Sequence, residues 1–530
     1  MKRINITHQD FEKIKQTDWF YLDKTKKICN LISDTSNSHY FFARPRRFGK
    51  SIMCSVMKNM FLGKKKLFKN LYAYDHRNWD ETFPVIYISF ASRTQNIDPD
   101  KYLQERIQIY IWEKRYTLNE LTLETDVNFL LRALLKSIYQ KTWKPSAIII
   151  DEYDKPVLTH LSDPVKAEEM RTTFRNFYSL IKDSNEYIRF FRLSGLTKVM
   201  KMNIFSVLNN LNDISLQKEY ADLIWFTQTE VEENFAEEID LLAKENKLSR
   251  EKTMEKIKER YNGFNFWDNN NTLYNPRDIN NLVLKQTFKY YRADTGIPSG
   301  IKEYMETKVG DVNNLIKKVK NREAVLTENN LSLQNLATID MSILFFQSGY
   351  LTTAESIGNM YKLKFPNKQA EVVFTEFFAK LIKPTANIAE RQLIADQFYE
   401  GLFGNDTEKM QLALQKLFYE QLADTPGERT KKNPEWWMKS FVGALLRLSN
   451  IYRRGEIPGL GVRSDLLIVD RKNSDHCWIV ECKVDETPEK AIEQIKSKYI
   501  KTVATKFKKI SMLGINRNRK TEKIEVEYVL

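Results

Sequence analysis

The sequence predicts an α/β protein in which two α/β parts are separated by a mainly helical region. In the first part, short and nearly continuous apolar runs alternate with longer helical stretches, as in a parallel sheet covered on both faces. The last part again alternates strand-like and helical stretches. From about residue 230 to residue 450 the pattern is predominantly helical. We therefore expect three regions, 1–290, 291–425 and 426–530.

The first region contains four candidate strands, each a short run of β-branched or aromatic residues. They span residues 40–43, 85–90, 147–150 and 188–193. Helical stretches such as 51–61 and 167–183 lie between them. Strands that alternate with helices are typical of a parallel sheet.

The helical region opens with a recognisable start signal. Thr227 is followed three residues later by Glu230, the spacing of a capping box. Short strand-like pieces near 348–353 and 361–365 interrupt the helices. Polar breaks at 268–271 and 424–427 are the best candidates for boundaries.

Length and composition fit a globular protein with more than one core. At 530 residues, and with roughly 100–200 residues per domain, two to four domains are expected. A hydrophobic content of 42% with 29% charged residues is ordinary for a globular protein and argues against wholesale disorder. The net charge of +14 suits a polyanionic partner such as nucleic acid. It also suits a Lys- and Asn-rich chain with a generally solvated surface, so the charge alone does not decide between them.

The sequence favours a reducing, aqueous compartment. Its four cysteines include no CxxC pair and no ladder of the kind found in secreted disulfide scaffolds. No apolar signal-peptide region follows the first residues, and no run reaches the about 20 apolar residues of a membrane helix. We expect a cytoplasmic location and no membrane association.

A phosphate-binding loop is indicated where the first candidate strand meets a helix. The junction reads RPRRFGKS over residues 44–51. Gly49 lets the backbone approach phosphate, Lys50 would reach the β- and γ-phosphates, and the Ser51 hydroxyl would hold Mg²⁺. Arg44 stands where the usual loop motif has its first glycine.

The strand at 147–150 ends in two acids that complete this pattern. Asp151 would contact Mg²⁺, and Glu152 would polarise the attacking water. Buried strands capped by solvated acids are common. A loop and an acid pair about a hundred residues apart, each at the carboxyl end of a strand, together favour ATP with Mg²⁺.

The strand at 188–193 and the basic loop offer further contacts. Ser194 or Thr197 could sense the γ-phosphate, or could instead cap the next helix. Arg44, Arg46 and Arg47 could neutralise phosphate or face solvent.

Five separated motifs in order resemble the bacterial AAA-ATPase-like family. They are FYLDKT at 20–25, RPRRFGKS at 44–51, IDEYD at 150–154, YNGF at 261–264 and LYNP at 273–276. The resemblance covers roughly residues 1–290, and it implies that Arg44 is a family trait. It also implies a P-loop ATPase domain and, commonly, a C-terminal domain of the PD-(D/E)XK nuclease superfamily.

The C-terminal region contains a carboxylate–lysine constellation. Strands are expected at 465–469, 478–484, 510–515 and 524–529, and helices at 436–448 and 488–500. Glu481 and Lys483 share one face of their strand, with Cys482 opposite. A hairpin loop centred on Asn473 would place Asp465 opposite Glu481. The two acids would then hold Mg²⁺ beside an ammonium group, or form a cross-strand salt bridge.

The flanking segments resemble the nuclease domain of that family. Glu481, Lys483 and Gln494 match its ExK and Q-I-K-x-K elements, and Asp465 its GR-x-D element with one residue inserted. Its helical Glu could be Glu435 or Glu456. A Thr487 N-cap followed by Pro488 predicts the start of the helix that carries Gln494.

These observations favour an ATP-hydrolysing enzyme that acts on nucleic acid, with DNA favoured, through a Mg²⁺-dependent nuclease-like domain. A second hypothesis is an ATP-controlled binding switch whose nuclease fold recognises nucleic acid or a protein and cuts nothing. A third is a signalling ATPase with a protein partner. A homo-oligomer, with an arginine supplied by a neighbouring subunit, is compatible with each.

Overall fold

The structure, a computed structural model, divides into two compact units, Met1–Val373 and Phe374–Leu530. The residues described are 2–34, 36–46, 49–91, 99–113, 127–198, 208, 210–265, 271–291, 299–308, 312, 315–316, 318–319, 322–327, 336, 339–374, 388–422, 442, 466–469, 475–521 and 523–530.

The first unit is built on a five-stranded parallel sheet in the order β2-β3-β4-β1-β5. Its strands are β1 (His39–Ala43), β2 (Val85–Ser89), β3 (Ser146–Asp151), β4 (Ile188–Gly195) and β5 (Asn212–Asp213). The four expected strands are confirmed. The two-residue β5 was not predicted, because it is polar and joins the sheet only through its pairing with Tyr40 and Phe41. Since β4 lies between β1 and β3, the loops that follow these three strands meet at one edge.

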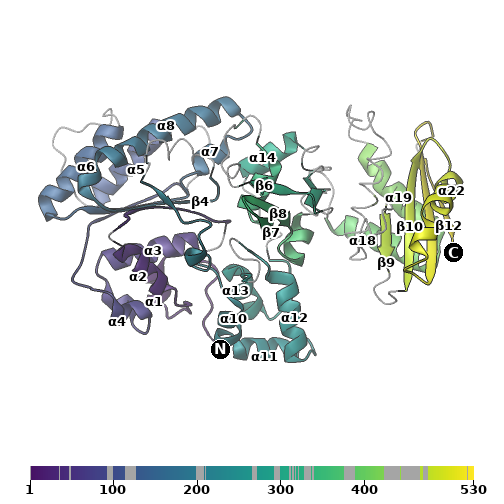
Figure 1. The fold of residues 1–530 in the computed structure, drawn as a ribbon, viewed down its shortest axis with the longest axis horizontal. Helices are drawn as coiled ribbons and strands as arrows, with labels where there is room; N and C mark the ends of the chain where they lie inside the picture. Colours follow the sequence, from purple (N-terminus) through teal and green to yellow (C-terminus); the bar gives the residue numbers. More distant parts are fainter. Residues whose placement is uncertain are drawn as a thin grey trace. The chain divides into compact units, whose positions relative to one another are not determined.

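Helices cover both faces of this sheet (Figure 1). One face carries α1 (Phe11–Gln16), α2 (Thr25–Ser33), α3 (Lys50–Phe61), η1 (Lys65–Phe68) and α4 (Tyr72–His76). The other carries α5 (Pro99–Glu113), α6 (Val127–Thr142), α7 (Lys155–Thr159) and α8 (Pro164–Asp183), and η2 (Asn185–Tyr187) leads into β4. Strands covered on both sides have no exposed face, which is why β1 and β3 read as continuous apolar runs.

A helical group follows η3 (Lys218–Tyr220). It consists of α10 (Gln228–Asn234), α11 (Ala236–Glu245), α12 (Arg250–Tyr261) and α13 (Pro276–Lys285). The predicted capping box is confirmed: Thr227 accepts from the Glu230 backbone, and the Glu230 carboxylate accepts from the Thr227 backbone. Apolar side chains from this group pack with Leu22 into a core of their own.

A small antiparallel sheet closes the first unit, with strand order β6-β8-β7. It contains β6 (Val325–Thr327), β7 (Thr352–Ile357) and β8 (Met360–Lys364), accompanied by α14 (Ser299–Thr307) and α16 (Met341–Gln347). The expected strand at 348–353 was placed too early. Ser348 instead caps α16, and its hydroxyl donates to the carbonyl of Leu344 at 2.6 Å. The short strand β6 was not predicted.

The second unit contains a four-stranded mixed sheet in the order β12-β11-β10-β9. Its elements are α18 (Ile388–Gly404), α19 (Thr407–Leu422), β9 (Leu466–Val469), β10 (His476–Val484), α22 (Pro488–Lys498), α23 (Ile500–Val503), β11 (Lys509–Asn518) and β12 (Lys523–Val529). β10 and β11 are parallel, and the other pairs are antiparallel. The expected strands are confirmed, and the Thr487 N-cap is too. The helix predicted at 436–448 lies outside the described residues, except for the helical position Val442.

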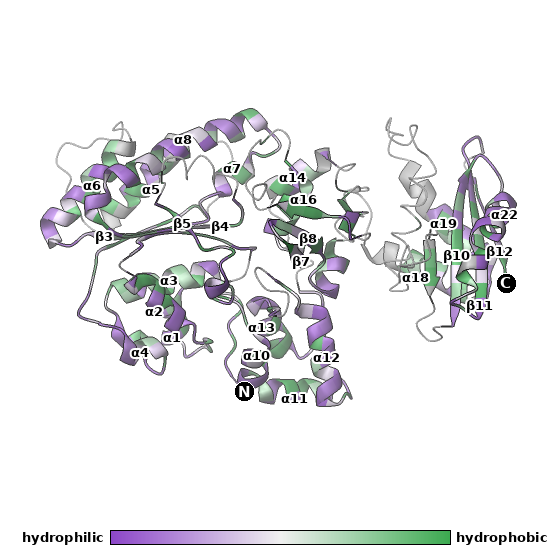
Figure 2. Ribbon diagram, viewed as in Figure 1, coloured by the Kyte–Doolittle hydropathy of each residue, from purple (hydrophilic) through white to green (hydrophobic). Residues whose placement is uncertain are grey.

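The two faces of this sheet have different cores. Trp478, Val480 and Cys482 pack with residues of α18 and α19, whereas Cys477 and Ile479 pack under α22. Figure 2 shows that β10 and α16 are largely hydrophobic, while α6 and α8 carry many hydrophilic residues. In the part of the chain that the structure describes, no helix combines the length and apolar character that a membrane crossing needs.

Candidate functional site

The loop after β1 brings its lysine back over its own backbone. Gly49 adopts a left-handed conformation with φ of 86°, and α3 begins at Lys50. This backbone suits glycine, because a side chain there would be strained. The Lys50 ammonium donates to the carbonyls of Arg44 at 2.7 Å and Pro45 at 2.9 Å. Lys50 therefore lies inside the loop, at the N-terminal end of a twelve-residue helix.

The charge balance around Lys50 is set by burial and by nearby acids. Only 7% of Lys50 is exposed. Burial lowers the pKa of its ammonium, whereas the negative charges of Asp151, Glu152 and Asp154 raise it. Three acids, at the end of β3 and in the turn that follows it, therefore lie within electrostatic range of the loop lysine.

Asp151 lies at the carboxyl end of the parallel strands, where its own strand β3 comes into contact with α3 and β4. It ends β3 and is 1% exposed. The Ser51 hydroxyl of α3 donates to its Oδ2 at 2.6 Å, and the Ser194 hydroxyl of β4 donates to its Oδ1 at 2.9 Å. The structure thus brings together Ser51 and Asp151, a hundred residues apart in the sequence.

The Ser51–Asp151 pair fits Mg²⁺ in its chemistry. A hydroxyl oxygen and a carboxylate oxygen are hard donors, and Mg²⁺ is usually held by one or two protein groups together with waters and phosphate oxygens. Among the described residues there is no group of three or more His, Cys, Asp or Glu side chains that could hold a metal ion alone. The pair would therefore need the phosphates themselves to complete the coordination.

Glu152 has an unusual backbone for a residue with a side chain. Its φ is 53°, and its carboxylate lies 3.6 Å from the Lys155 ammonium. Non-glycine residues in this region cost energy and occur often at functional sites. Its carboxylate is 30% exposed, so it is reachable from solvent next to the buried Asp151.

Asp154 holds the segment after β4 in place. Its carboxylate accepts from the backbone of Leu196 and from the backbone and hydroxyl of Thr197. Burial raises the pKa of Asp154, and these donors act in the opposite direction. Gly195 is needed here because a Cβ would lie 2.4 Å from the Tyr153 ring and 2.5 Å from Asp154.

The two candidate sensors therefore have different surroundings. Ser194 contacts Asp151, whereas the fully buried Thr197 is bonded to Asp154. The phosphate-binding role of Thr197 stays a prediction. The contribution of Asp154 was not predicted separately, although two acids spaced three residues apart after an apolar strand could have drawn attention to it.

The three loop arginines differ in placement. Arg44 is 1% exposed, donates to the carbonyls of Ala43 and Ser215, and lies 4.7 Å from the centre of the Phe42 ring. These contacts fix the Arg44 side chain against the end of β1. Arg46 is close enough for its charge to lower the pKa of Lys50. Arg47 lies outside the described residues.

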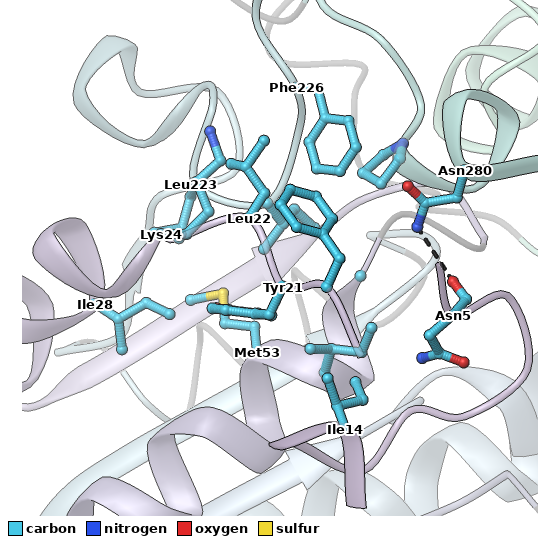
Figure 3. A pocket seen from close by; sticks show the side chains of 15 residues that line it. Asn5, Ile14, Tyr21, Leu22, Lys24, Ile28, Met53, Leu223, Phe226 and Asn280 are labelled. Atoms are coloured by element: carbon cyan, nitrogen blue, oxygen red, sulfur yellow. Dashed lines mark hydrogen bonds between the residues drawn. The ribbon is translucent and has the colours of Figure 1, made fainter. Parts of the chain in front are cut away.

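A pocket opens beside the loop (Figure 3). Gly49, Ile52 and Met53 form its wall on the side of α3. The remaining lining comes from the N-terminal segment, from the chain before α10 and from α13: Asn5, Ile14, Phe20, Tyr21, Leu22, Lys24, Ile28, Leu223, Ile224, Phe226, Pro276 and Asn280. Two of the motifs noted in the sequence, at 20–25 and 273–276, thus contribute to this pocket.

In the second unit, Glu481 and Lys483 lie on the face of β10 that α22 covers. Glu481 is 1% exposed, and the Gln494 amide of α22 donates to its carboxylate. The same amide lies 3.1 Å from the Tyr499 hydroxyl. β9 and β10 pair in the register that the sequence predicts, from Cys477–Val469 to Val480–Leu466. Asp465, like Glu435 and Glu456, lies outside the described residues, so the predicted trio is not assembled here in full.

A parallel sheet in which the inner strand β1 runs into a glycine–lysine–serine loop, beside an acid at the end of β3, defines a nucleotide-binding P-loop protein. Residues 5–205 match the family described as predicted AAA-ATPase. The chain is 30% identical over 536 residues to an uncharacterized protein in the vnfD 5′ region of Azotobacter chroococcum mcd 1. That match covers 99% of this chain and 98% of the relative. The chain belongs to the predicted AAA-ATPase family, and its N-terminal domain is of the ATP-binding type.

Proposed function

We propose that the first unit hydrolyses ATP and that this activity controls a Mg²⁺-dependent nuclease-like domain, which acts on DNA. The observation that carries the first half is the 2.6 Å contact between Ser51 and Asp151, next to Lys50 and Glu152. Bound Mg²⁺ would neutralise phosphate charge there. Lys50 would bind the phosphates, and Glu152 would orient the attacking water and accept its proton.

Glu152→Gln tests the hydrolytic role. The amide keeps the shape of the side chain but cannot accept the proton, so steady-state ATP hydrolysis should fall by about a hundredfold or more, with ATP still bound. Glu168→Gln is the matched control, because Glu168 is a partly exposed acid on α8 paired with Arg171. Hydrolysis that is unchanged in Glu152→Gln would remove Glu152 from the mechanism.

The nuclease half of the proposal rests on β10 and α22. Glu481 and Lys483 share a face, and Gln494 reaches Glu481 from the covering helix. A sheet in which α22 connects the parallel strands β10 and β11, with β9 antiparallel, agrees with a PD-(D/E)XK arrangement. Asp465 and Glu481 would hold Mg²⁺, and Lys483 would stabilise the charge that develops on the phosphate.

Lys483→Ala tests that assignment. Mg²⁺-dependent cleavage of plasmid and single-stranded DNA should be lost, because the positive charge beside Glu481 disappears. Lys490→Ala is the control, since Lys490 is an exposed lysine on α22 paired with Glu486. Equal cleavage by Lys483→Ala and wild type would show that Lys483 has no catalytic role.

A second candidate function is an ATP-controlled binding switch without cleavage. The observation that favours it is the burial of Glu481, whose carboxylate is already engaged by Gln494. The switch would be supported if the wild-type protein binds DNA in a nucleotide-dependent way but does not cleave it, whichever divalent metal is added. A steep fall of DNA affinity as the salt concentration rises would argue against a function whose partner is a protein.

A further inference from the structure

The outward face of α6 combines aromatic and basic side chains. At about 100° per residue, one stripe of this helix and of the residue that follows it contains Phe129, Arg132, Lys136, Tyr139, Gln140 and Trp143. The opposite face is apolar and buried. The solvent-facing stripe of such a helix normally carries polar and charged residues of both signs. Here aromatic residues alternate with basic ones, and no position of the stripe is acidic.

An aromatic cluster lies where α6 ends. The ring centre of Tyr139 is 5.5 Å from that of Tyr187 and 6.4 Å from that of Trp143. Trp143 is 80% exposed, and its φ is 53°, a conformation that is uncommon and costly for a bulky residue. A large ring is thus held in the solvent at an energetic cost. This arrangement is expected of a surface that binds a partner.

The charges around the cluster are mainly positive. Between residues 127 and 150 there is no acid, and the cations are Arg132, Lys136, Lys141 and Lys144. The Glu186 carboxylate raises the pKa of the Tyr187 hydroxyl, and the charge of Arg132 acts in the opposite direction. Arg132 therefore lies close to the aromatic cluster, with Glu186 at its margin. The surface suits an anionic partner.

This surface and the phosphate site lie at opposite edges of the sheet. Trp143 comes shortly before β3, and Tyr187 directly precedes β4, so both are at the amino ends of parallel strands. Asp151, in contrast, stands at the carboxyl end of β3. The two places are therefore separate, and a substitution at one can be tested without altering the other.

The stripe offers the groups that bind single-stranded nucleic acid. Aromatic rings stack on bases of any kind, and neighbouring cations contact the phosphates. A duplex hides the faces of its bases inside the stack, so a stacking surface favours a single strand. At 1.5 Å per residue, the stretch from Phe129 to Trp143 is about 21 Å long. That is the length of about six nucleotides at roughly 3.4 Å each.

We propose that the α6 stripe binds single-stranded DNA, with bases stacked on Tyr139 and Trp143 and phosphates bound by Arg132 and Lys136. The inference rests on the proposed action on DNA, and it names a surface of the first unit that holds the strand. The stripe thus gives the ATPase unit its own contact with the DNA, in addition to the nuclease-like domain.

The test measures binding of the full chain to a fluorescently labelled deoxythymidine strand of about 20 nucleotides, by anisotropy with Mg²⁺ and ATP. Trp143→Asn should weaken binding about fivefold to a hundredfold, because one stacked base is lost. Asparagine tolerates the left-handed backbone, so the fold is preserved. Trp143→Phe keeps a stacking ring and should stay within about threefold of wild type.

Lys136→Gln tests the phosphate contacts. It should weaken binding and reduce the slope of log affinity against log salt concentration by about 0.7, since one contact with the strand is lost. Lys252→Gln is the control, because Lys252 is an exposed lysine of α12, and it should leave the slope unchanged. Trp143→Asn should bind ATP as wild type does when DNA is absent.

The outcomes separate this inference from the function on which it rests. If wild type binds the strand and both Trp143→Asn and Lys136→Gln bind it equally well, the α6 surface is wrong and DNA remains the partner. Equal affinity of wild type for the single strand and for a duplex of the same length would also contradict the stacking surface. Wild type that binds neither form of DNA would contradict the proposed action on DNA itself.

Discussion

Asp151 lies at the centre of the proposed phosphate site, because hydroxyl groups from two different elements donate to it. Ser51 reaches it from α3 and Ser194 from β4, and neither strand nor helix could position both alone. The strand order is what makes this possible, since β4 lies between β1 and β3. At the scale of single residues, the site is therefore a consequence of how three strand ends meet.

A buried histidine provides a pH-dependent prediction at this scale. His39 opens β1, is 1% exposed, and has its pKa lowered by burial from 6.5 to about 4. Between pH 6.5 and about pH 4, the unfolded chain therefore binds a proton at His39 that the folded chain does not bind. Its contribution to stability is present above pH 6.5 and is lost as the pH falls toward 4.

We expect His39→Phe, which fills the site without titrating, to remove this loss. Between pH 7 and pH 4.5 the free energy of unfolding of wild type should fall by about 2–3 kcal/mol more than that of the variant. Urea denaturation at the two pH values measures the difference. Parallel behaviour of the two proteins would show that His39 is not the buried neutral group.

Sequence alone could indicate most residues of the proposed phosphate site. Gly49, Lys50, Ser51 and Asp151 follow from a strand–loop–helix pattern whose chemistry is local. The surroundings of Thr197 and Arg44 could not be foreseen, because they depend on Asp154 and Ser215, which approach only in the folded chain.

At the scale of elements, α10 is tied to the N-terminal segment by an ion pair. Lys24 is 9% exposed and pairs with Glu230, which also completes the capping box of α10. Removing one charge would leave the other poorly solvated. The pair therefore connects the pocket wall to the start of the helical group.

We expect Glu230→Gln to lower the free energy of unfolding by about 2 kcal/mol, because glutamine preserves the capping geometry but leaves Lys24 without its counter-charge. Thr227→Ala, which removes the cap alone, should cost about 1 kcal/mol. In Lys24→Met/Glu230→Gln part of the loss should be recovered. Denaturation curves of wild type, the two single variants and the double variant measure these free energies of unfolding. If the double variant recovers none of the stability lost in Glu230→Gln, the unpaired charge of Lys24 is not the main cause of that loss.

The packing of α22 on β11 depends on a glycine. A Cβ at Gly514 would lie 2.3 Å from the carbonyl oxygen of Pro488 and 3.1 Å from Ile492. Gly514→Ala should therefore push the helix away and destabilise the second unit by about 1–3 kcal/mol. Thermal denaturation measures this effect. It should also weaken cleavage, because Gln494 lies on the displaced helix.

Gly404→Ala is the control for this prediction. It lies at the end of α18, with open space where a Cβ would stand. It should be neutral or slightly stabilising, by up to about 1 kcal/mol. Equal stability of Gly514→Ala and Gly404→Ala would mean that α22 adjusts without cost.

Most elements could be predicted from period and composition, and the exceptions have physical causes. The strands of the second unit alternate toward two separate cores, so β9 to β12 were found and the hairpin register was too. β5 and β6 are only two and three residues long. Such strands exist through pairing with neighbours, and a periodicity argument has too few residues to detect them.

At the scale of the whole molecule, contacts separate residues 1–373 from 374–530. The three-part division expected from the sequence, like the nucleic-acid partner and the oligomeric state, stays a prediction. The relative from Azotobacter chroococcum mcd 1 matches along nearly the entire chain, so the sequences of both units have counterparts in it. ATP binding in the first unit is the premise on which the proposed coupling between the units depends.

The most direct test of that premise is ATP binding to the full chain and to Lys50→Ala, measured by calorimetry with Mg²⁺. Wild type should bind one ATP per chain, and Lys50→Ala should bind about tenfold to a hundredfold more weakly, because a charged hydrogen bond to phosphate is lost. Lys64→Ala, which removes a partly exposed lysine paired with Glu12, should match wild type. Equal ATP affinity in wild type and Lys50→Ala, or no binding by wild type, would contradict the assignment of the site.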